Sequence, residues 1–229
     1  MKILLLLNND IHSATALRLL EKDLENHQIK IILSRKVGNT DFLPADLLEL
    51  KQREYFEIEK NFSYQTDFCS NINSTESLQD LKIFAPDLII SIRFGQILKN
   101  DVINIPRCGV LNLHSGILPN YRGVMASFWA ILNGEKNLGT TLHYINDSKI
   151  DTGEIIAFSK TEIDRNSSLL ANINNLYKNG CALISQTLEK ISANEKIQTI
   201  NQKSLGQGNY FSYPKEDEVK RFLKLLPLF

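Results

Sequence analysis

The chain has 229 residues, and its 26 basic side chains balance 26 acidic ones, which gives a formal net charge of zero. This length favours one domain with a small appendage, and the charge balance argues against a nucleic-acid partner or an anionic membrane surface. No run of about 18 apolar residues occurs, which excludes a membrane span. Three distant cysteines without a CxxC pair are typical of a protein of the reducing cytoplasm.

Apolar runs and helical patterns alternate along the first half of the chain, as expected for parallel strands joined by crossover helices. The apolar run at residues 2–9 is predicted to be a buried strand and not a signal peptide, because asparagine and aspartate follow where a cleavage site would lie. A helix over residues 13–26, with apolar positions every three or four residues, and a strand over residues 29–34 complete this unit.

The next segment is less regular. Helices are predicted over residues 45–56 and 77–84, with a polar loop at residues 61–73 between them. Strands follow over residues 87–92 and 109–114, and their continuous apolar character indicates that both faces are covered.

The second half of the chain completes the sheet. A helix is predicted over residues 125–133, strands over 139–145 and 154–163, and a long helix over 167–191. The pattern therefore predicts an α/β fold with a mostly parallel sheet flanked by helices, and we assign residues 1–192 to this main domain.

The remaining residues, 193–229, have a different pattern and are predicted to form a small hairpin and helix that serve in substrate binding or dimerisation. Short β-type runs flank the glycines of SLGQG, which favours a hairpin, and a helix is expected after Pro214. The ending LKLLPLF carries five large apolar residues, so we expect a homodimer, with packing of this tail on its own core as the alternative.

Two polar side chains interrupt the apolar strand at residues 109–114. Asn112 and His114 are two residues apart, so both leave the same face of the strand, near the end where ligands of open α/β sheets bind. Asp151 heads a Thr-Gly turn downstream and can reach a neighbouring strand end. The alternative for His114 is a hydrogen-bonded core histidine, and His143 is expected to be structural.

These three groups have complementary chemistry. The Asn112 amide can donate a hydrogen bond to an oxyanion, His114 can donate or shuttle a proton, and Asp151 can orient the ring or position a water. No serine or cysteine nucleophile is paired with the histidine, so the set suits direct transfer between two bound substrates.

The run LNLHSGILPNYRG, followed by FWAILNGEKNLGTTLHYINDSKIDTGEII, resembles the signature of the formyltransferase family that uses 10-formyltetrahydrofolate. The Asn-x-His pair, the LP-x-x-RG loop, the NGE turn, the T-x-H strand and the D-x-G turn occur in order between residues 95 and 156. The resemblance implies a Rossmann-like sheet and catalytic roles for Asn112, His114 and Asp151. One departure is Ser115-Gly116, where many relatives carry Pro-Ser.

The resemblance also implies a binding site for the folate, without any metal, along the loop that precedes the Asn112 strand. The residues implied to surround the pterin are Phe94, Gly95, Gln96, Ile97, Leu98 and Ile103. Plain core packing is the alternative for the three aliphatic ones.

Further features of the sequence indicate which amine accepts the formyl group. The segment after the first strand contains no glycine-rich phosphate loop, which argues against glycinamide ribonucleotide. The initiator-tRNA enzymes carry a further carboxyl-terminal domain with a basic face, whereas this chain is neutral overall, which argues against initiator tRNA. The segment GNYFSYPKEDEV resembles members that formylate nucleotide-linked amino sugars. The resemblance implies dTDP-4-amino-4,6-dideoxyglucose as acceptor, for O-antigen or other surface polysaccharide synthesis.

The acceptor residues follow from this resemblance. Tyr210 and Phe211 are candidates to stack on the nucleobase, with anchoring in the core as the alternative. The candidates for the diphosphate are Asn9, Arg35, Lys36 and Arg122, with simple solvation as the alternative for the charged ones. A folate- or nucleotide-sugar-binding protein without turnover is the competing hypothesis from another class.

Overall fold

A computed structural model of the chain, which describes residues 1–35 and 42–229, contains one large sheet of seven strands. These strands are β1 (Lys2–Asn8), β2 (Gln28–Ser34), β3 (Gln65–Phe68), β4 (Leu88–Ile92), β5 (Val110–His114), β7 (Asn137–Tyr144) and β8 (Ile155–Glu162). Their order is β3-β2-β1-β4-β5-β7-β8; the pairs from β3 to β5 are parallel, and β7 and β8 are antiparallel to their neighbours.

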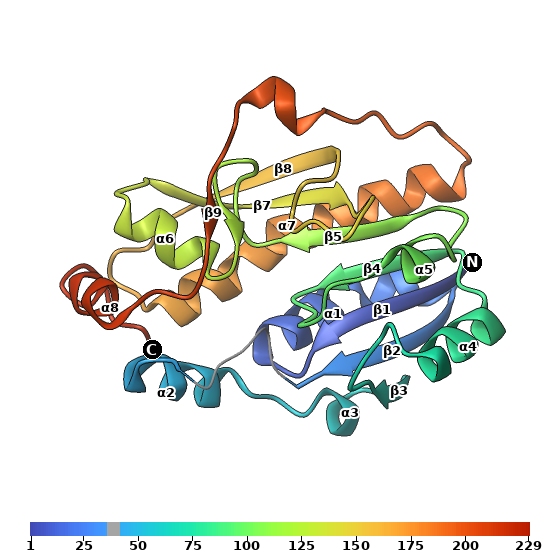
Figure 1. Cartoon of the computed structure of the whole chain (residues 1–229), viewed down its shortest axis with the longest axis horizontal. Helices are drawn as coiled ribbons and strands as arrows, with labels where there is room; N and C mark the ends of the chain where they lie inside the picture. The colour runs from blue at the N-terminus through green and yellow to red at the C-terminus, as the bar shows by residue number, and fades with distance from the viewer. Residues whose placement is uncertain (36–41) are drawn as a thin grey trace.

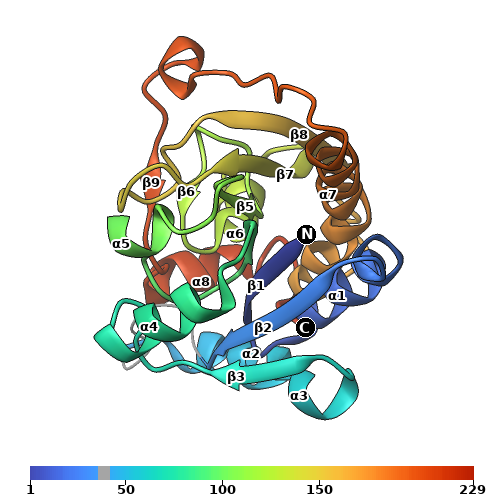
Figure 2. The ribbon, with the colours of Figure 1, turned by 90° about the vertical axis from the view of Figure 1, so that its right-hand side faces the viewer.

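Helices cover this sheet on both faces (Figures 1 and 2), which confirms the predicted fold class. They are α1 (Ile11–Leu24), α2 (Ala45–Glu54), α3 (Ile58–Asn61), α4 (Thr75–Phe84), α5 (Asn100–Ile103), α6 (Ala126–Leu132), α7 (Leu169–Ser192) and α8 (Glu216–Phe222). None of the helices in the described part of the chain has the length and hydrophobicity needed to cross a lipid bilayer.

Strand β1 shows why the central strands read as unbroken apolar runs. Ile3, Leu5 and Leu7 belong to the hydrophobic cluster under α1 and α7, and the alternate residues Leu4 and Leu6 belong to the cluster under α4 and α5. Because successive side chains of a strand point to opposite faces, a sheet covered on both faces needs apolar residues at every position.

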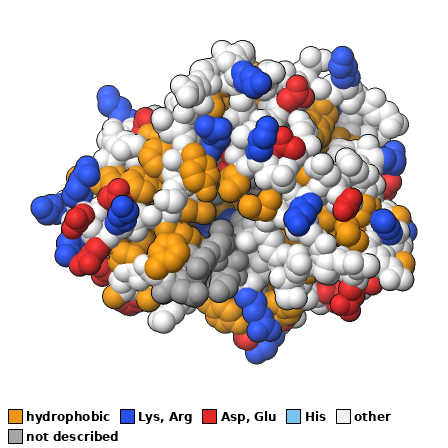
Figure 3. Space-filling model, viewed as in Figure 1, with side chains coloured by type: hydrophobic (Ala, Val, Ile, Leu, Met, Phe, Trp, Pro, Cys, Tyr) orange, Lys and Arg blue, Asp and Glu red, His pale blue; other side chains and the backbone are white. Residues whose placement is uncertain are grey.

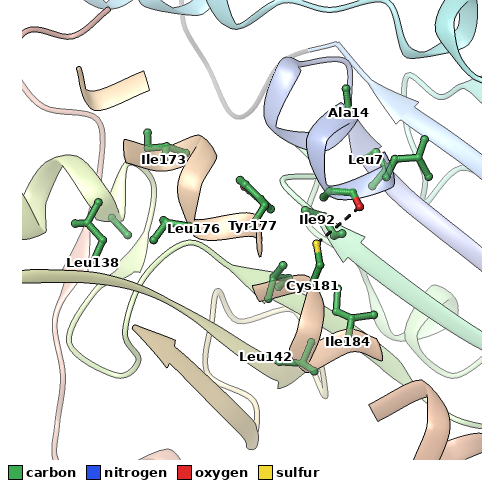
Figure 4. Packing of buried hydrophobic residues seen from close by; sticks show 14 of the residues in the cluster. Leu7, Ala14, Ile92, Leu138, Leu142, Ile173, Leu176, Tyr177, Cys181 and Ile184 are labelled. Carbon is green, nitrogen blue, oxygen red and sulfur yellow. Dashed lines mark hydrogen bonds between the residues drawn. The ribbon is translucent and has the colours of Figure 1, made fainter. Parts of the chain in front are cut away.

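Helices α1 and α7 lie side by side on one face of the sheet, and Figure 4 shows the packing between them. Tyr177 and Cys181 of α7 point toward α1, and the Cys181 sulfur lies 3.7 Å from the Ala16 carbonyl oxygen. Burial raises the pKa of the Cys181 thiol to about 12. Cys181 is therefore a small core residue, whereas Cys69 and Cys108 are only partly buried.

Two elements differ from the sequence prediction. Helix α1 begins at Ile11, two residues earlier than expected, because the Asp10 carboxylate accepts the Ser13 N–H at 2.8 Å and caps the helix. The predicted loop at residues 61–73 contains β3, a short strand at the edge of the sheet. Most of its side chains are exposed, so it lacks the apolar pattern by which a strand is recognised.

The carboxyl-terminal segment does not form the predicted hairpin. It forms one turn of 3-10 helix, η1 (Gln202–Leu205), and a two-residue strand, β9 (Tyr210–Phe211), which pairs in parallel with β6 (Arg122–Gly123). In Figure 1 this segment crosses above β8 and descends through β9 to α8. The appendage therefore packs on the main sheet's loops instead of pairing with itself.

The apolar tail divides into two sets of residues. Leu226 and Leu228 are buried, whereas Leu223, Leu225 and Phe229 remain about half exposed, at 43%, 47% and 39%. Part of the tail thus packs on its own core, which was the alternative to dimerisation, and part stays on the surface.

Candidate active site

A cleft of about 540 Å³ opens at the carboxyl ends of β4 and β5. In the sheet, β2 lies on one side of β1 and β4 lies on the other, so the strand order reverses between β1 and β4. The carboxyl ends of these strands therefore form the topological switch point, where ligands of open α/β sheets bind. Figure 3 shows a hollow near the centre of this face, flanked by hydrophobic side chains. The volume is within the range of small-molecule sites.

The pairing of β5 with β7 brings two polar side chains together in the cleft. Asn112 lies directly opposite His143 in the antiparallel register, so both side chains leave the same face. The Asn112 Nδ2 atom is 3.0 Å from His143 Nε2, and His143 Nδ1 is 2.8 Å from the Tyr144 carbonyl oxygen. A carbonyl only accepts, so Nδ1 carries the proton and Nε2 accepts from the asparagine.

His143 therefore belongs to the polar cluster, which the sequence analysis did not predict. His143 could have been predicted only by combining two facts: which side chains of the T-x-H strand share one face, and how that strand pairs with the Asn-x-His strand. That register is set by tertiary structure and cannot be read from either strand alone.

The His114 ring lies beside the carboxylate of Asp151. His114 Nε2 is 2.6 Å from the Tyr121 carbonyl oxygen, so this nitrogen carries a proton. The other ring nitrogen, Nδ1, is 3.5 Å from Asp151 Oδ2. A second proton on the ring would be carried by Nδ1 and would lie between it and the Asp151 carboxylate. The carboxylate can therefore stabilise a His114 imidazolium.

Asp151 is the centre of the cluster. Its Oδ2 accepts the Gly123 N–H at 2.9 Å, and its Oδ1 lies 3.4 Å from Asn112 Nδ2 and 3.5 Å from His143 Nε2. Burial by itself would raise the pKa of Asp151, but the His114 and His143 imidazoles and the Gly123 N–H outweigh it and lower this pKa to about 2. The carboxylate is therefore ionised at neutral pH.

The D-x-G turn has a backbone that explains its residue types. Asp151 has a left-handed conformation, with φ of 54°, and Gly153 packs directly against the Tyr144 carbonyl, where a β-carbon would collide. Gly116 is similarly constrained, because a β-carbon there would lie 2.8 Å from His114 Nε2. The glycine at position 116, where many relatives carry serine, therefore leaves room for the His114 ring. Asn112, His114 and Asp151 still lie together.

A second charged cluster also borders the cleft. Arg93 bonds Asp10 through Nε at 2.8 Å and Glu54 through a terminal nitrogen at 3.1 Å, and Lys51 bonds Glu54 at 2.7 Å. Burial opposes ionisation of both carboxyls, but Arg93 beside Asp10, and Lys51 with Arg93 beside Glu54, hold their pKa values below the ordinary ones. Lys51, Glu54 and Arg93 line the cleft, and the sequence analysis missed them.

The loop predicted to surround the pterin lies along the cleft, with one exception. Five of its six residues line the cleft: Phe94, Gly95, Gln96, Ile97 and Leu98. Ile103 is on α5, in the hydrophobic cluster under α4 and α5, and is not among the described residues that line the cleft. Ile103 therefore packs in the core, which was the alternative to a role in pterin binding. The Gln96 side chain also ties this loop to the backbone of Cys69 and Ile72, each at 2.7 Å.

The two aromatic candidates point to different places. Tyr210 lines the cleft and is 54% exposed. Phe211 stacks on Tyr121 and Trp129, with ring centroids 5.6 and 5.0 Å apart, and is not one of the described cleft residues. Phe211 therefore anchors the carboxyl-terminal segment in the core, and only Tyr210 offers a ring to a ligand.

Three of the four diphosphate candidates are described by the structure, and these three do not line the cleft. Asn9 is buried and accepts the Ile58 N–H at 2.9 Å, and Arg35 lies over the Phe68 ring at 4.8 Å. Arg122 on β6 contacts the Gln207 carbonyl at 3.4 Å, and Lys36 lies outside the described residues. None of the three described candidates lines the cleft. Asn9 and Arg35 make other contacts, whereas the buried Arg122 Nε has no hydrogen-bond partner among the described residues.

The fold and this cluster match a known family. A family model described as formyl transferase covers residues 1–204, and the chain therefore belongs to the formyl transferase family. The chain is 29% identical over 177 residues to a methionyl-tRNA formyltransferase of Clostridium acetobutylicum, which covers 76% of this chain and 54% of that protein. It is 38% identical over 120 residues to the enzyme of that name from Clostridium beijerinckii, across 52% and 39% of the two chains. The chain thus spans about half or less of these relatives.

Solved structures with the same fold include enzymes of another acceptor class. A sugar N-formyltransferase from a Shewanella species superposes with a TM-score of 0.63 at 17% identity, over 98% of this chain and 88% of that one. An N-formyltransferase from Helicobacter canadensis, in complex with folinic acid and dTDP-3-aminofucose, gives 0.63 at 23% identity, over 93% and 71% of the two chains. At these identities the likeness shows the fold.

Proposed function

We propose that this protein transfers the formyl group of 10-formyltetrahydrofolate to the amino group of a nucleotide-linked sugar. The observation that carries the proposal is the Asn112, His114 and Asp151 cluster in a cleft of ligand size, with an ionised carboxylate beside the His114 ring. Membership of the formyl transferase family supports the chemistry.

The folate would have an apolar surface in the cleft. This surface is offered to a flat heterocycle by Phe94, Ile97, Leu98, Val124 and Ile145, all of which line the cleft. Two related structures were solved with folate derivatives, one of them with dTDP and 5-N-formyl-THF. Both observations support a folate as the formyl donor.

In the proposed reaction the unprotonated sugar amine attacks the formyl carbon, so that a carbon–nitrogen bond forms and a tetrahedral oxyanion develops. The Asn112 amide nitrogen has a 3.0 Å contact to His143 and a longer, weaker one of 3.4 Å to Asp151. The N–H that faces Asp151 is therefore the one that donates to the oxyanion. His114, stabilised as an imidazolium by Asp151, assists the oxyanion and the proton transfer. The carbon–N10 bond then breaks, and the proton lost by the amine reaches the leaving nitrogen.

We infer dTDP-4-amino-4,6-dideoxyglucose as the acceptor and a product used in the cytoplasm for surface polysaccharides such as the O-antigen of lipopolysaccharide. The exposed Tyr210 ring at the cleft and the nucleotide-sugar ligands of the related structures support this acceptor class. The second candidate is initiator tRNA, which the sequence identity to methionyl-tRNA formyltransferases favours.

One experiment separates these functions. The protein is incubated with 10-formyltetrahydrofolate and, separately, with dTDP- and UDP-linked amino sugars, glycinamide ribonucleotide and methionyl-tRNA, and products are analysed by mass spectrometry. We expect a gain of one formyl group on a nucleotide sugar. A gain only on the tRNA contradicts the acceptor, and no gain on any of them favours a binding protein without turnover.

Removing the Tyr210 ring is expected to weaken binding of dTDP by about 1 to 3 kcal/mol, the range for a base stacked on an aromatic side chain. Binding of a folate analogue should hardly change, because the proposed pterin site is formed mainly by the loop at residues 94–98. Calorimetric titration of Tyr210→Ala with both ligands measures this. Tyr55→Ala is the matched control, since Tyr55 is equally exposed, at 53%, but does not line the cleft.

We also propose a homodimer that buries the exposed apolar tail residues Leu223, Leu225 and Phe229. Light scattering at micromolar concentration is expected to give twice the 26.1 kDa of one chain. Leu225→Glu should shift this mass toward that of one chain. A single-chain mass for the unmodified protein contradicts the proposal.

A further inference from the structure

The carboxyl-terminal segment reaches the turn that carries Asp151. Gln202, at the start of η1, is only 7% exposed, and its side-chain nitrogen donates to the Asp151 carbonyl at 3.0 Å and to the Gly153 carbonyl at 2.7 Å. A primary amide has two N–H groups, so both of its donors are used on this one turn.

The position of Gln202 is itself fixed. Two residues earlier, Ile200 and Ile155 exchange both backbone hydrogen bonds, at 2.8 and 2.9 Å, which ties the segment to the start of β8. The Asn201 side chain accepts the Lys203 N–H at 3.0 Å and begins η1. The amide of Gln202 is therefore held by backbone on both sides.

The turn needs such support because of its conformation. Asp151 is a non-glycine residue at φ 54°, a left-handed conformation that is uncommon for L residues, although aspartate adopts it more often than most. Its carboxylate makes one short hydrogen bond, to the Gly123 N–H, and otherwise only contacts of 3.4 to 3.5 Å to Asn112, His114 and His143. A small rotation of the turn would separate these groups.

The same segment fixes the other side of the short hydrogen bond. Gly123 pairs with Phe211 of β9, and the Val124 N–H donates to the Phe211 carbonyl at 3.0 Å. Residues 202–211 thus fix both Asp151, through Gln202, and the Gly123 donor, through β9.

We infer that Gln202 is a positioning residue: its double hydrogen bond fixes the turn so that the Asp151 carboxylate stays against Gly123 and beside His114. The inference rests on the proposed function for the role of Asp151 in turnover. The claim that Gln202 stabilises the hydrogen bond between Asp151 and Gly123 does not depend on that function.

The test uses Gln202→Met, which keeps the length of the side chain but removes both donors, and Gln202→Glu. Gln198→Met is the control, because Gln198 is an exposed glutamine of the same segment. We expect the kcat of Gln202→Met to fall about 10- to 100-fold, the cost of misplacing a reacting group by about 1 Å, with KM for the formyl donor unchanged.

The pH profile of Gln202→Glu distinguishes positioning from simple loss of stability. An ionised carboxylate has no donor for the two carbonyls, whereas a protonated one regains a single O–H donor. The deficit in kcat relative to the unmodified protein should therefore shrink as the pH is lowered from about 8 to about 5. A deficit independent of pH, or an unchanged kcat in Gln202→Met, overturns the inference.

A measurement without turnover keeps the test independent of the proposed function. Hydrogen exchange of the Gly123 amide, which donates to Asp151, should accelerate in Gln202→Met while the Leu113 amide in β5 keeps its protection. Unchanged exchange at Gly123 overturns the inference. A protein that shows this acceleration but forms no formylated product would contradict the proposed function alone.

Discussion

Asp151→Asn is expected to lower turnover by about 10² to 10⁴-fold while leaving the fold intact. Asparagine has nearly the same shape and can still accept the Gly123 N–H, so the turn retains its backbone. What is lost is the negative charge 3.5 Å from His114 Nδ1, and with it the stabilisation of the imidazolium that the proposed mechanism requires.

The same reasoning applies to the ring. His114→Gln should lose activity in the same range, since an amide can replace the hydrogen bond to the Tyr121 carbonyl but cannot transfer a proton. Initial rates of formyl transfer measure both losses. The controls are Asp80→Asn on the exposed side of α4 and His27→Gln at the end of α1, both outside the cleft. Turnover near that of the unmodified protein in either site variant contradicts the assignment.

The pKa of Asp151 adds a constraint on the pH profile. Its folded value of about 2 is depressed below the ordinary 3.8, so the carboxylate is ionised throughout the neutral range and protonates only as the pH falls toward 2. A step in the pH–rate profile of the unmodified protein between about pH 5 and 9 therefore cannot come from this residue, and any such step has to come from another group or from the acceptor amine.

Arg93→Met is expected to destabilise the protein by about 3 to 5 kcal/mol, the cost of removing one partner from a buried ion pair. Asp10 and Glu54 are 1% and 3% exposed, and Arg93 lies between their carboxylates. Without its charge, two buried anions face each other, while Lys51 stays paired with Glu54 and the His12 imidazole lies 3.5 Å from the same carboxylate. Urea unfolding monitored by circular dichroism measures the loss.

The pH dependence of this loss has a definite sign. The folded pKa values of Asp10 and Glu54 are lowered, so the stability they contribute is fully present above their ordinary values of 3.8 and 4.5 and is lost as the pH falls below them. The unmodified protein should therefore lose stability below about pH 4.5, and the difference from Arg93→Met should narrow there. Arg93→Lys, which keeps the charge, is the control; a loss below about 1 kcal/mol in Arg93→Met contradicts the argument.

The sequence predicted the elements whose residues face a core on both sides. Strands β1, β4 and β5 are recognisable because every position has to be apolar, and Asn112 and His114 stand out against that background. Strand β3 escaped prediction because its edge position leaves its side chains in solvent, where polar residues are tolerated.

The site was predictable only where a motif is local. The spacing of Asn112 and His114 lies within one strand, and the D-x-G turn marks Asp151. His143 depends on a register between two strands, and the Arg93 cluster joins residues from β1, α2 and the end of β4, which no local pattern connects. The predicted hairpin failed for the same reason: the partner of β9 is β6, far earlier in the chain.

The position of Gln202 and β9 in the chain also sets when the cleft can be completed during synthesis. A ribosome adds about 5 to 20 residues per second, and strands β1, β2 and β4 leave it long before residues 202–211 do. The core of the sheet can therefore fold while the turn at Asp151 still lacks its amide partner and Gly123 lacks β9. The contacts that fix the polar cluster cannot form until residues 202–211 have been synthesised, so a nascent chain can build its central strands before it can complete the cleft.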